Sequence, residues 1–154
     1  RYGKINTEYD NNYKPVKNKI GTWKTIQKGE KIAVLSVGSM VSTAIEVGKL
    51  LKNNDKLNIT IYNCIYIKPL DTEVLKDLYR NHDLVVTIEE GSISGGFGSS
   101  ILEYCSKNRI TLNIKNIGIE DNFITHGSRS ELLDLTGLSV NKIYNQIKTF
   151  YEEK

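Results

Sequence analysis

The chain has 154 residues, of which 39% are hydrophobic and 25% are charged, and its formal net charge is +3. This length fits one domain with a full core and is too short for two domains of ordinary size. The lysines are spread along the sequence and form no block that could follow a nucleic-acid backbone. No apolar run reaches the roughly 18 residues of a membrane span. We therefore predict neither a nucleic-acid partner nor a membrane partner.

The two cysteines, Cys64 and Cys105, lie far apart in segments that the apolar pattern predicts to be buried. This placement favours free thiols in a reducing compartment over a disulfide. No signal peptide opens the sequence, and the first residue is not methionine. We interpret the chain as a piece of something longer.

The first part of the sequence predicts a connection followed by a sheet. Residues 1–19 are polar and are interrupted by Pro15, so we expect the end of a preceding domain or a linker. Residues 20–27 alternate weakly around Trp23, which is typical of a short edge strand. Residues 32–37 are continuously apolar and predict a strand that is covered on both faces.

The next segment predicts a helix and then a second strand. Ser39 is placed to cap a helix that carries its apolar residues at helical spacing through residue 51. Residues 57–63 predict a strand, which we expect to extend through residue 67. Pro69 ends it, because proline cannot donate a ladder hydrogen bond.

The strand–helix alternation continues through the middle of the chain. Asp71 is placed to cap a helix, and residues 84–88 predict the next strand. Residues 98–107 then predict a helix and residues 112–119 a further strand.

Two helices end the chain. Ser128 and Glu131 form a capping-box pattern at the start of a short helix, which Gly137 ends. Ser139 is placed to cap the last, amphipathic helix. Repeated strand–helix units with apolar strands predict an α/β fold of three layers, in which a mostly parallel sheet of about five strands lies between helices.

A glycine-rich turn follows the strand at residues 84–88. It contains Gly91, Gly95, Gly96 and Gly98 and leads directly into a helix. Such a turn can pack against another segment or cradle an anion, but the spacing is not that of the dinucleotide-binding fingerprint. We predict that Gly96 tolerates no β-carbon, because its turn needs a positive φ or a close backbone approach.

Glu89 and Glu90 stand at the carboxyl end of that strand, where open α/β sheets place their ligand sites. Neighbouring strand residues point to opposite faces, so the two carboxylates cannot act as an acid–base pair on one substrate. We interpret one as a brace of the glycine turn and the other as a solvent-facing residue, and we leave a functional role open.

The two histidines are weaker candidates. His126 could carry a proton or hold an anion, but a loop histidine bonded to nearby backbone explains it equally simply. His82 follows a helix, and charge–dipole stabilisation suffices to explain its position. The histidines and cysteines do not have metal-site spacing, and no nucleophile elbow or Walker loop is present. We therefore predict no catalytic, cofactor-binding or metal-binding residue in this chain.

Five segments together carry a family resemblance. They are Arg1-Tyr2-Gly3-Lys4, Ala33-Val34-Leu35-Ser36-Val37-Gly38-Ser39-Met40, Lys68-Pro69-Leu70-Asp71, the glycine turn with Glu89-Glu90, and Phe123-Ile124-Thr125-His126-Gly127-Ser128. In this combination they resemble the C-terminal domain of the 1-deoxy-D-xylulose-5-phosphate synthases, a thiamine-diphosphate family of the transketolase superfamily. The resemblance implies that residues 1–19 end the preceding domain and that residues 20–154 form a transketolase-type C-terminal domain.

The resemblance implies a transferase that condenses pyruvate with glyceraldehyde 3-phosphate, releases carbon dioxide and feeds the non-mevalonate isoprenoid pathway. Thiamine diphosphate and Mg²⁺ would then be bound by upstream domains that this chain lacks. The expected partners are those upstream domains and a second subunit of a homodimer. The glycine turn would be a packing and interface element, and the isolated chain would be inactive.

One substrate contact is implied at the start of the chain. Family members commonly read Arg-Tyr-Pro-Arg there, and the second arginine helps to hold the phosphate of glyceraldehyde 3-phosphate. The matching residue is Lys4, preceded by Gly3 in place of proline, and Arg1 is a second candidate. Lysine binds phosphate but lacks the bidentate fork of arginine.

Two other readings of the sequence stay open at this point. One is the C-terminal half of a 2-oxoacid dehydrogenase beta subunit, which docks an acyltransferase partner. The other is a free-standing, flavodoxin-like nucleotide-binding module. The abundance of lysine, asparagine and isoleucine suggests an AT-rich genome. We expect a cytoplasmic location in a bacterium, or a plastid or apicoplast stroma in a plastid-bearing eukaryote.

Overall fold

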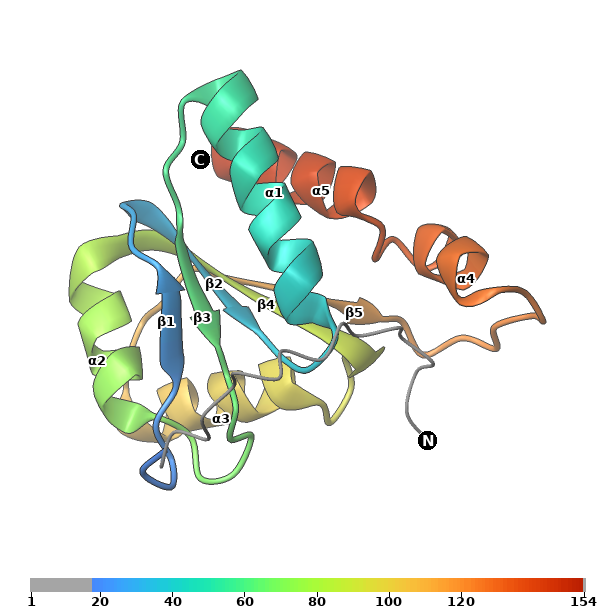
Figure 1. The fold of residues 1–154 in the computed structure, drawn as a ribbon. Coiled ribbons are helices and arrows are strands. Elements are labelled where there is room, and N and C mark those ends of the chain that lie inside the picture. Colours follow the sequence, from blue (N-terminus) through green and yellow to red (C-terminus); the bar gives the residue numbers. More distant parts are fainter. Residues whose placement is uncertain (1–17, 154) are drawn as a thin grey trace, which may run out of the picture.

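The computed structural model describes residues 18–153 and forms one sheet flanked by helices (Figure 1). The elements follow in this order: β1 (Lys24–Gln27), β2 (Lys31–Ser36), α1 (Met40–Asp55), β3 (Thr60–Asn63), α2 (Thr72–Asn81), β4 (His82–Ser92), α3 (Phe97–Asn108), β5 (Ile114–Ile119), α4 (Arg129–Leu135) and α5 (Val140–Glu152). The five strands lie in the order β1-β3-β2-β4-β5. All pairs are parallel except β1 with β3, so the antiparallel strand is at an edge.

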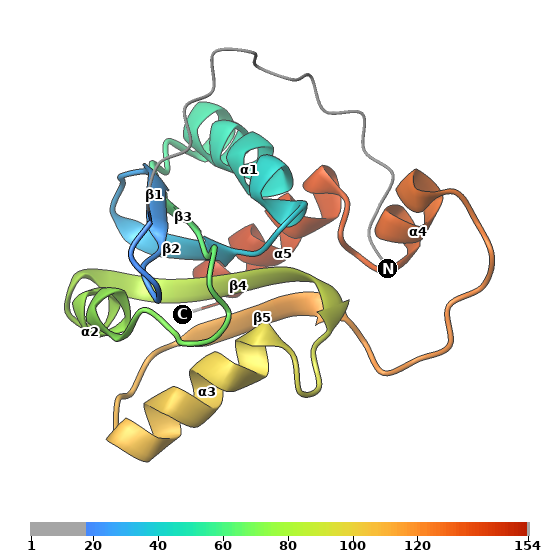
Figure 2. The same ribbon diagram turned by 60° about the horizontal axis from the view of Figure 1, so that its bottom comes forward.

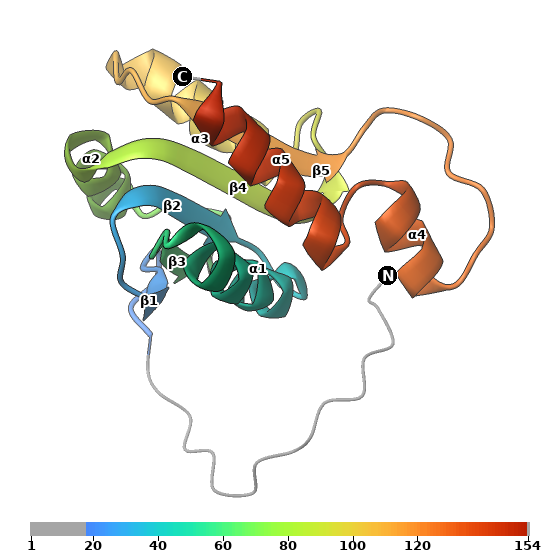
Figure 3. The ribbon, with the colours of Figure 1, turned by 90° about the horizontal axis from the view of Figure 1, so that it is seen from above.

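Helices cover both faces of the sheet, and α1 and α5 lie over the same face (Figures 1 and 3). Ile32 and Val34 of β2 point into the core beneath these two helices. Ala33 and Leu35 point the other way, into the core that α2 and α3 close. Successive strand residues face opposite sides of a sheet, and in β2 both sides are buried. The predicted three-layer α/β fold with a mostly parallel sheet is confirmed.

Strand boundaries depart from the predictions where pairing decides them. β3 ends at Asn63 and does not extend through residue 67, because its parallel pairing with β2 stops at Ser36 and Asn63. β4 is longer than predicted and runs to Ser92, where it pairs again with Ile119 of β5. Hydrogen bonds to a distant strand set these ends, and the local sequence pattern does not contain them.

All four residues predicted to cap helices stand at N-cap positions, and two of them make the capping hydrogen bond. Asp71 accepts a hydrogen bond from the Val74 amide at 3.1 Å. Ser128 and Glu131 form the reciprocal capping box. Ser39 and Ser139 also stand at the N-cap positions of α1 and α5, but neither side chain bonds the first turn of its helix.

Both cysteines are free thiols in the core on the α2–α3 side of the sheet. Burial raises the pKa of each thiol above its usual range, so both are held in the unreactive protonated form. None of the described helices is both long and apolar enough to cross a membrane.

Candidate functional site

The carboxyl ends of β2, β3, β4 and β5 lie at one edge of the sheet, which we call the carboxyl edge. The glycine turn, the start of α1 and the segment of residues 120–128 all follow strand ends at this edge. Residues 120–128 run out beyond the ends of β4 and β5 before α4 begins (Figure 2). This is the edge at which α/β folds bind their ligands.

Glu89 braces the glycine turn by hydrogen bonds from its carboxylate to backbone amides at the start of α3. Its Oε2 accepts a hydrogen bond from the Phe97 amide at 2.8 Å, and its Oε1 accepts one from the Gly98 amide at 2.9 Å. The carboxylate thus satisfies two unpaired amides at the positive end of α3. The place where an external phosphate would bind a helix N-terminus is filled by this side chain.

The close approach predicted at Gly96 is present. A β-carbon on Gly96 would lie 2.2 Å from the Ser92 carbonyl oxygen and 2.5 Å from Glu89 Oε2. Its φ is −81°, so the constraint is space and not a left-handed backbone. The left-handed residue of the turn is its neighbour Gly95, with φ of 74°. The turn is a tightly packed element.

We expect Glu89→Gln to lower the free energy of unfolding by about 1–3 kcal/mol, because the new amide group cannot accept from the amide that it faces. Urea unfolding at neutral pH measures the change. Glu103→Gln, at an exposed position of α3, is the matched control and should have no effect. Equal stabilities of the two variants would contradict the bracing role.

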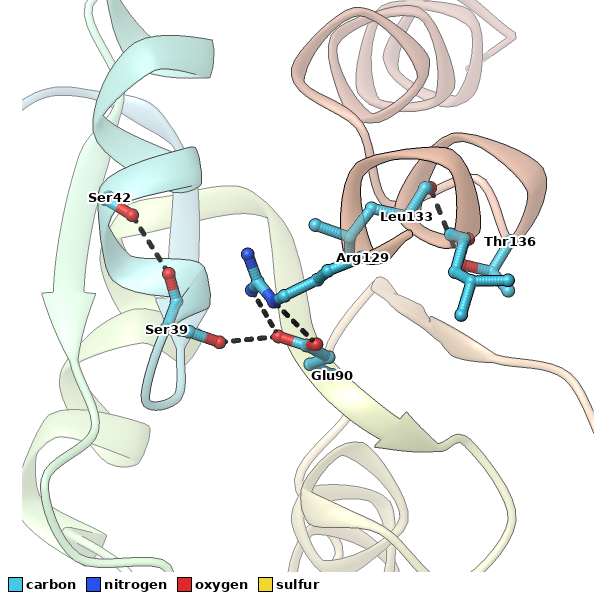
Figure 4. A network of polar contacts seen from close by, with 7 residues as sticks. Ser39, Ser42, Glu90, Arg129, Leu133 and Thr136 are labelled. Carbon is cyan, nitrogen blue, oxygen red and sulfur yellow. Dashed lines mark hydrogen bonds and ion pairs between the residues drawn. The ribbon is translucent and has the colours of Figure 1, made fainter. Parts of the chain in front are cut away.

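Glu90 ties three elements together (Figure 4). Arg129 donates to it from Nε at 3.0 Å and from a terminal nitrogen at 2.5 Å. Ser39 Oγ donates to the same carboxylate at 2.6 Å. The end of β4 is thereby joined to the starts of α1 and α4. Our interpretation of one carboxylate as a brace is confirmed by Glu89. Glu90 is exposed, as we interpreted the other carboxylate, but it also forms an ion pair that the sequence did not indicate.

The ion pair shifts the titration of both partners. The hydrogen bonds from Arg129, helped by that from Ser39, hold the pKa of the Glu90 carboxyl below its usual value. Glu90 in turn raises the pKa of Arg129. The two side chains are 31% and 36% exposed, so water screens the pair and weakens it. Arg129 thus has its Nε and one terminal nitrogen engaged by Glu90, which balances its charge.

We expect Glu90→Gln to lower the free energy of unfolding near neutral pH by about 1 kcal/mol, as for a partly screened, bidentate pair. A lowered folded-state pKa stabilises the fold above the usual glutamate value of 4.5, and this stabilisation is lost as the pH falls through the folded-state pKa. The difference between wild type and variant should therefore shrink in acid, in urea unfolding curves at a series of pH values. Glu46→Gln, in the exposed Glu46–Lys49 pair of α1, is the control. A pH-independent difference would contradict the role of the ion pair.

A surface pocket of about 540 Å³ lies beside this ion pair. Its walls come from Glu90 and Arg129, from residues 124–127, and from the α4 residues Leu132 and Leu133. His126 is on this wall and is exposed. It makes no hydrogen bond with any residue in the range 18–153, so the backbone-bonded interpretation of His126 was wrong.

His82 lies at the opposite edge of the sheet, at the start of β4. His82 Nε2 lies 2.9 Å from Thr60 Oγ1 and shares a hydrogen bond with it, and the Thr60 hydroxyl also lies within hydrogen-bond distance of the Gly29 carbonyl oxygen. Burial lowers the pKa of His82 and favours its neutral form. His82 stands at the C-cap of α2, as the charge–dipole interpretation assumes, but its lowered pKa does not favour the charged ring that this interpretation requires.

The site holds no complete set of reacting groups among the described residues. No cluster of three or more histidine, cysteine, aspartate or glutamate side chains in residues 18–153 could hold a metal. Glu89 and Glu90 at the carboxyl edge are both engaged by partners within the chain. Lys4 and Arg1 lie outside the described residues. Sequence reasoning missed Ser39 and Arg129, which only the fold brings to Glu90.

Comparison with known proteins agrees with this fold. The sequence model of the family "Transketolase, C-terminal domain" matches residues 21–143. The chain belongs to this family. A solved structure described as a split-gene transketolase, an inactive beta4 tetramer, superposes with a TM-score of 0.80 at 25% identity, covering 87% of this chain and 43% of that one. A transketolase mutant from Pichia stipitis, at 15% identity and a TM-score of 0.61, shares the fold.

Curated relatives of this chain carry one name, 1-deoxy-D-xylulose-5-phosphate synthase. The protein from Parabacteroides distasonis is 40% identical over 129 residues, which are 84% of this chain and 20% of the relative. The protein from Francisella philomiragia is 36% identical over 138 residues, 88% of this chain and 21% of the relative. The protein from Azobacteroides pseudotrichonymphae is 36% identical and covers 99% of this chain. The chain spans about a fifth of the length of these relatives.

Proposed function

We propose that this chain is the C-terminal domain of a 1-deoxy-D-xylulose-5-phosphate synthase, a transferase that joins pyruvate to glyceraldehyde 3-phosphate with loss of carbon dioxide. The observation that carries the proposal is the shared name of relatives that are 36–40% identical over 84–99% of the chain. It favours the synthase over the 2-oxoacid dehydrogenase alternative. The filled helix N-terminus at Glu89 argues against the free-standing nucleotide-binding module.

Within that enzyme the domain has a structural and assembly role. Its two candidate carboxylates are both engaged: Glu89 braces the glycine turn, and Glu90 joins α1 and α4 to the sheet. A general acid or base must contact its substrate, whereas these two carboxylates hydrogen-bond to groups of their own chain. The preceding domains of the same polypeptide and a second subunit are the proposed partners.

The described residues do not fit thiamine diphosphate or its magnesium ion. A diphosphate needs free amides or cations, and Mg²⁺ needs several oxygen ligands. The amides at the start of α3 are taken by Glu89, Arg129 is paired with Glu90, and no cluster of acidic side chains in residues 18–153 is suitable. We therefore assign cofactor and metal binding to the upstream domains.

The relatives named above come from bacteria. This origin favours the cytoplasmic location of a bacterial enzyme over a plastid stroma for the protein to which the chain belongs.

We expect the chain alone to show no synthase activity and no binding of thiamine diphosphate, because residues 18–153 offer no suitable set of diphosphate and metal ligands. Calorimetric titration with thiamine diphosphate and Mg²⁺ tests the binding. The full-length polypeptide, titrated and assayed with both substrates, is the positive control. Saturable micromolar binding by the chain alone would contradict the accessory role, and a full-length protein without product would contradict the proposed reaction.

A further inference from the structure

The pocket beside the Glu90–Arg129 ion pair is lined partly by apolar and partly by polar groups. Its volume of about 540 Å³ is within the range of small-molecule sites. The apolar part of the lining consists of four aliphatic side chains, Ile119, Ile124, Leu132 and Leu133. A smaller hollow of about 310 Å³ shares Ile119 and Ile124 with it, so the apolar surface continues beyond the first pocket. Such a lining suits a ligand with an apolar part.

The pocket is held in shape by the fold. Ile119 and Leu133 pack against the core beneath α1 and α5. The α4 side of the pocket is fixed by the capping box at the start of α4 and by the ion pair that joins Arg129 to the end of β4 (Figure 4). A ligand that enters a preformed pocket loses little of its binding energy to ordering of the protein.

The polar part of the lining has donors without acceptors. The amides of residues 124–127 donate no hydrogen bond within residues 18–153, and the His126 ring bonds none of these residues either. Arg129 uses its Nε and one terminal nitrogen for Glu90, and its other terminal nitrogen has no hydrogen bond within the same range. The Glu90 carboxylate, the acceptor on this side, already receives Arg129 and Ser39. A ligand group that accepts several hydrogen bonds would therefore match this part of the pocket.

The charges of the lining favour a single negative charge on that group. Glu90, His126 and Arg129 are its only ionisable side chains, and Glu90 balances the charge of Arg129. A phosphate monoester or a diphosphate would bring a second negative charge close to Glu90, with no unpaired lysine or arginine in the lining to offset it. A carboxylate carries one charge and accepts hydrogen bonds at both oxygens.

We propose that this pocket binds a small organic monocarboxylate. Its carboxylate bonds the unused donors of residues 124–127 and Arg129, and its apolar part covers the four aliphatic side chains. The lining holds no set of reacting groups, so the site binds its ligand without converting it. This inference concerns the described residues of this chain and does not depend on the proposed function.

Titration of the 154-residue chain with phenylacetate, followed by nuclear magnetic resonance, tests the proposal. We expect saturable shifts of the amides of residues 124–127 and of the methyl groups of Ile119 and Ile124, with a dissociation constant in the millimolar range for a ligand of this size. Phenylacetamide lacks the charge, acetate lacks the ring, and phenyl phosphate carries a second charge. Each should bind at least about tenfold more weakly than phenylacetate. Equal or tighter binding of any of the three would overturn the proposed ligand class.

A matched pair of variants assigns the binding to the pocket. His126 is exposed and bonds no described residue, so His126→Ala should leave the thermal midpoint unchanged and yet weaken phenylacetate binding about tenfold. Tyr79→Ala, at a 52% exposed site on α2, should bind like wild type. Unchanged binding by His126→Ala would contradict the proposal.

The same titration of the full-length polypeptide tests whether the pocket is open there. The methyl groups of Ile119 and Ile124 should again shift with phenylacetate. Shifts in the 154-residue chain but not in the full-length polypeptide would show that other domains cover the pocket, and would overturn the proposal. Product formation is not measured in these titrations, so a failure here leaves the proposed function unaffected.

Discussion

Gly96→Val is expected to lower the free energy of unfolding of this domain by about 3–5 kcal/mol. The added β-carbon would meet the Ser92 carbonyl oxygen at 2.2 Å and both carboxylate oxygens of Glu89 within 2.7 Å. The carboxylate would have to move and release the amides of Phe97 and Gly98. The expected cost therefore combines overpacking with the loss of charge-assisted hydrogen bonds. Urea unfolding measures it.

Two alanine variants separate space from backbone conformation as the cause. A β-carbon on Gly95 meets nothing within 4 Å, but that residue has a φ of 74°. Gly95→Ala should therefore lower the free energy of unfolding by only about 1–2 kcal/mol, through backbone strain. Gly96→Ala has ordinary backbone angles and yet should lose more, because the contacts begin at the first added carbon. If Gly96→Val does not fold, the alanine pair still decides. A smaller effect of Gly96→Ala than of Gly95→Ala would show that the turn is loosely packed.

Local patterns predicted the elements of this fold because each element is coded by its own residues. The apolar run in β2 is buried on both faces, as its continuity requires. Ser128 and Glu131 are three residues apart and can reach each other only in a helical turn. The Glu89 brace also follows locally, since a carboxylate before a glycine turn is close to the amides that the turn exposes.

The remaining features depend on partners that are distant in the sequence. Ser39 has the residue type of a helix cap, yet its hydroxyl donates to Glu90, 51 residues later. Ser139 likewise donates to Asp134 at 2.7 Å instead of to its own helix. A hydroxyl bonds whichever acceptor the fold brings near, and a one-residue preference does not contain that information. The lowered pKa of His82 also depends on distant residues, because the burial that lowers it follows from the packing around the start of β4.

Glu90 illustrates the limit of prediction for the site itself. Alternation along a strand placed Glu89 and Glu90 on opposite sides, and this placement is confirmed by their separate partners. The partner Arg129 is 39 residues away on the helix after β5, beyond the reach of any spacing rule. A single acidic residue at a strand end and a single arginine at a helix start are common, and only the fold joins them.

Lys4 is the first candidate in this chain for a direct substrate contact, with Arg1 the second, and both lie outside the described residues 18–153. The proposal rests on its match to the second arginine of the Arg-Tyr-Pro-Arg segment of the synthase family. Glyceraldehyde 3-phosphate carries a phosphate and pyruvate does not. A cation that holds this phosphate therefore affects one substrate and spares the other.

In the full-length enzyme, Lys4→Ala is expected to raise the Michaelis constant for glyceraldehyde 3-phosphate and to leave that for pyruvate almost unchanged. A charge-assisted hydrogen bond contributes about 1.5–3 kcal/mol, which corresponds to a loss of roughly tenfold to a hundredfold in kcat/KM for the aldehyde. Lys4→Arg should keep or improve activity, because the guanidinium restores the bidentate fork of the family. Lys19→Ala, at an exposed lysine, is the control for loss of charge alone, and Arg1→Ala tests the second candidate. If Lys4→Ala affects both substrates equally, or neither, Lys4 does not hold the phosphate.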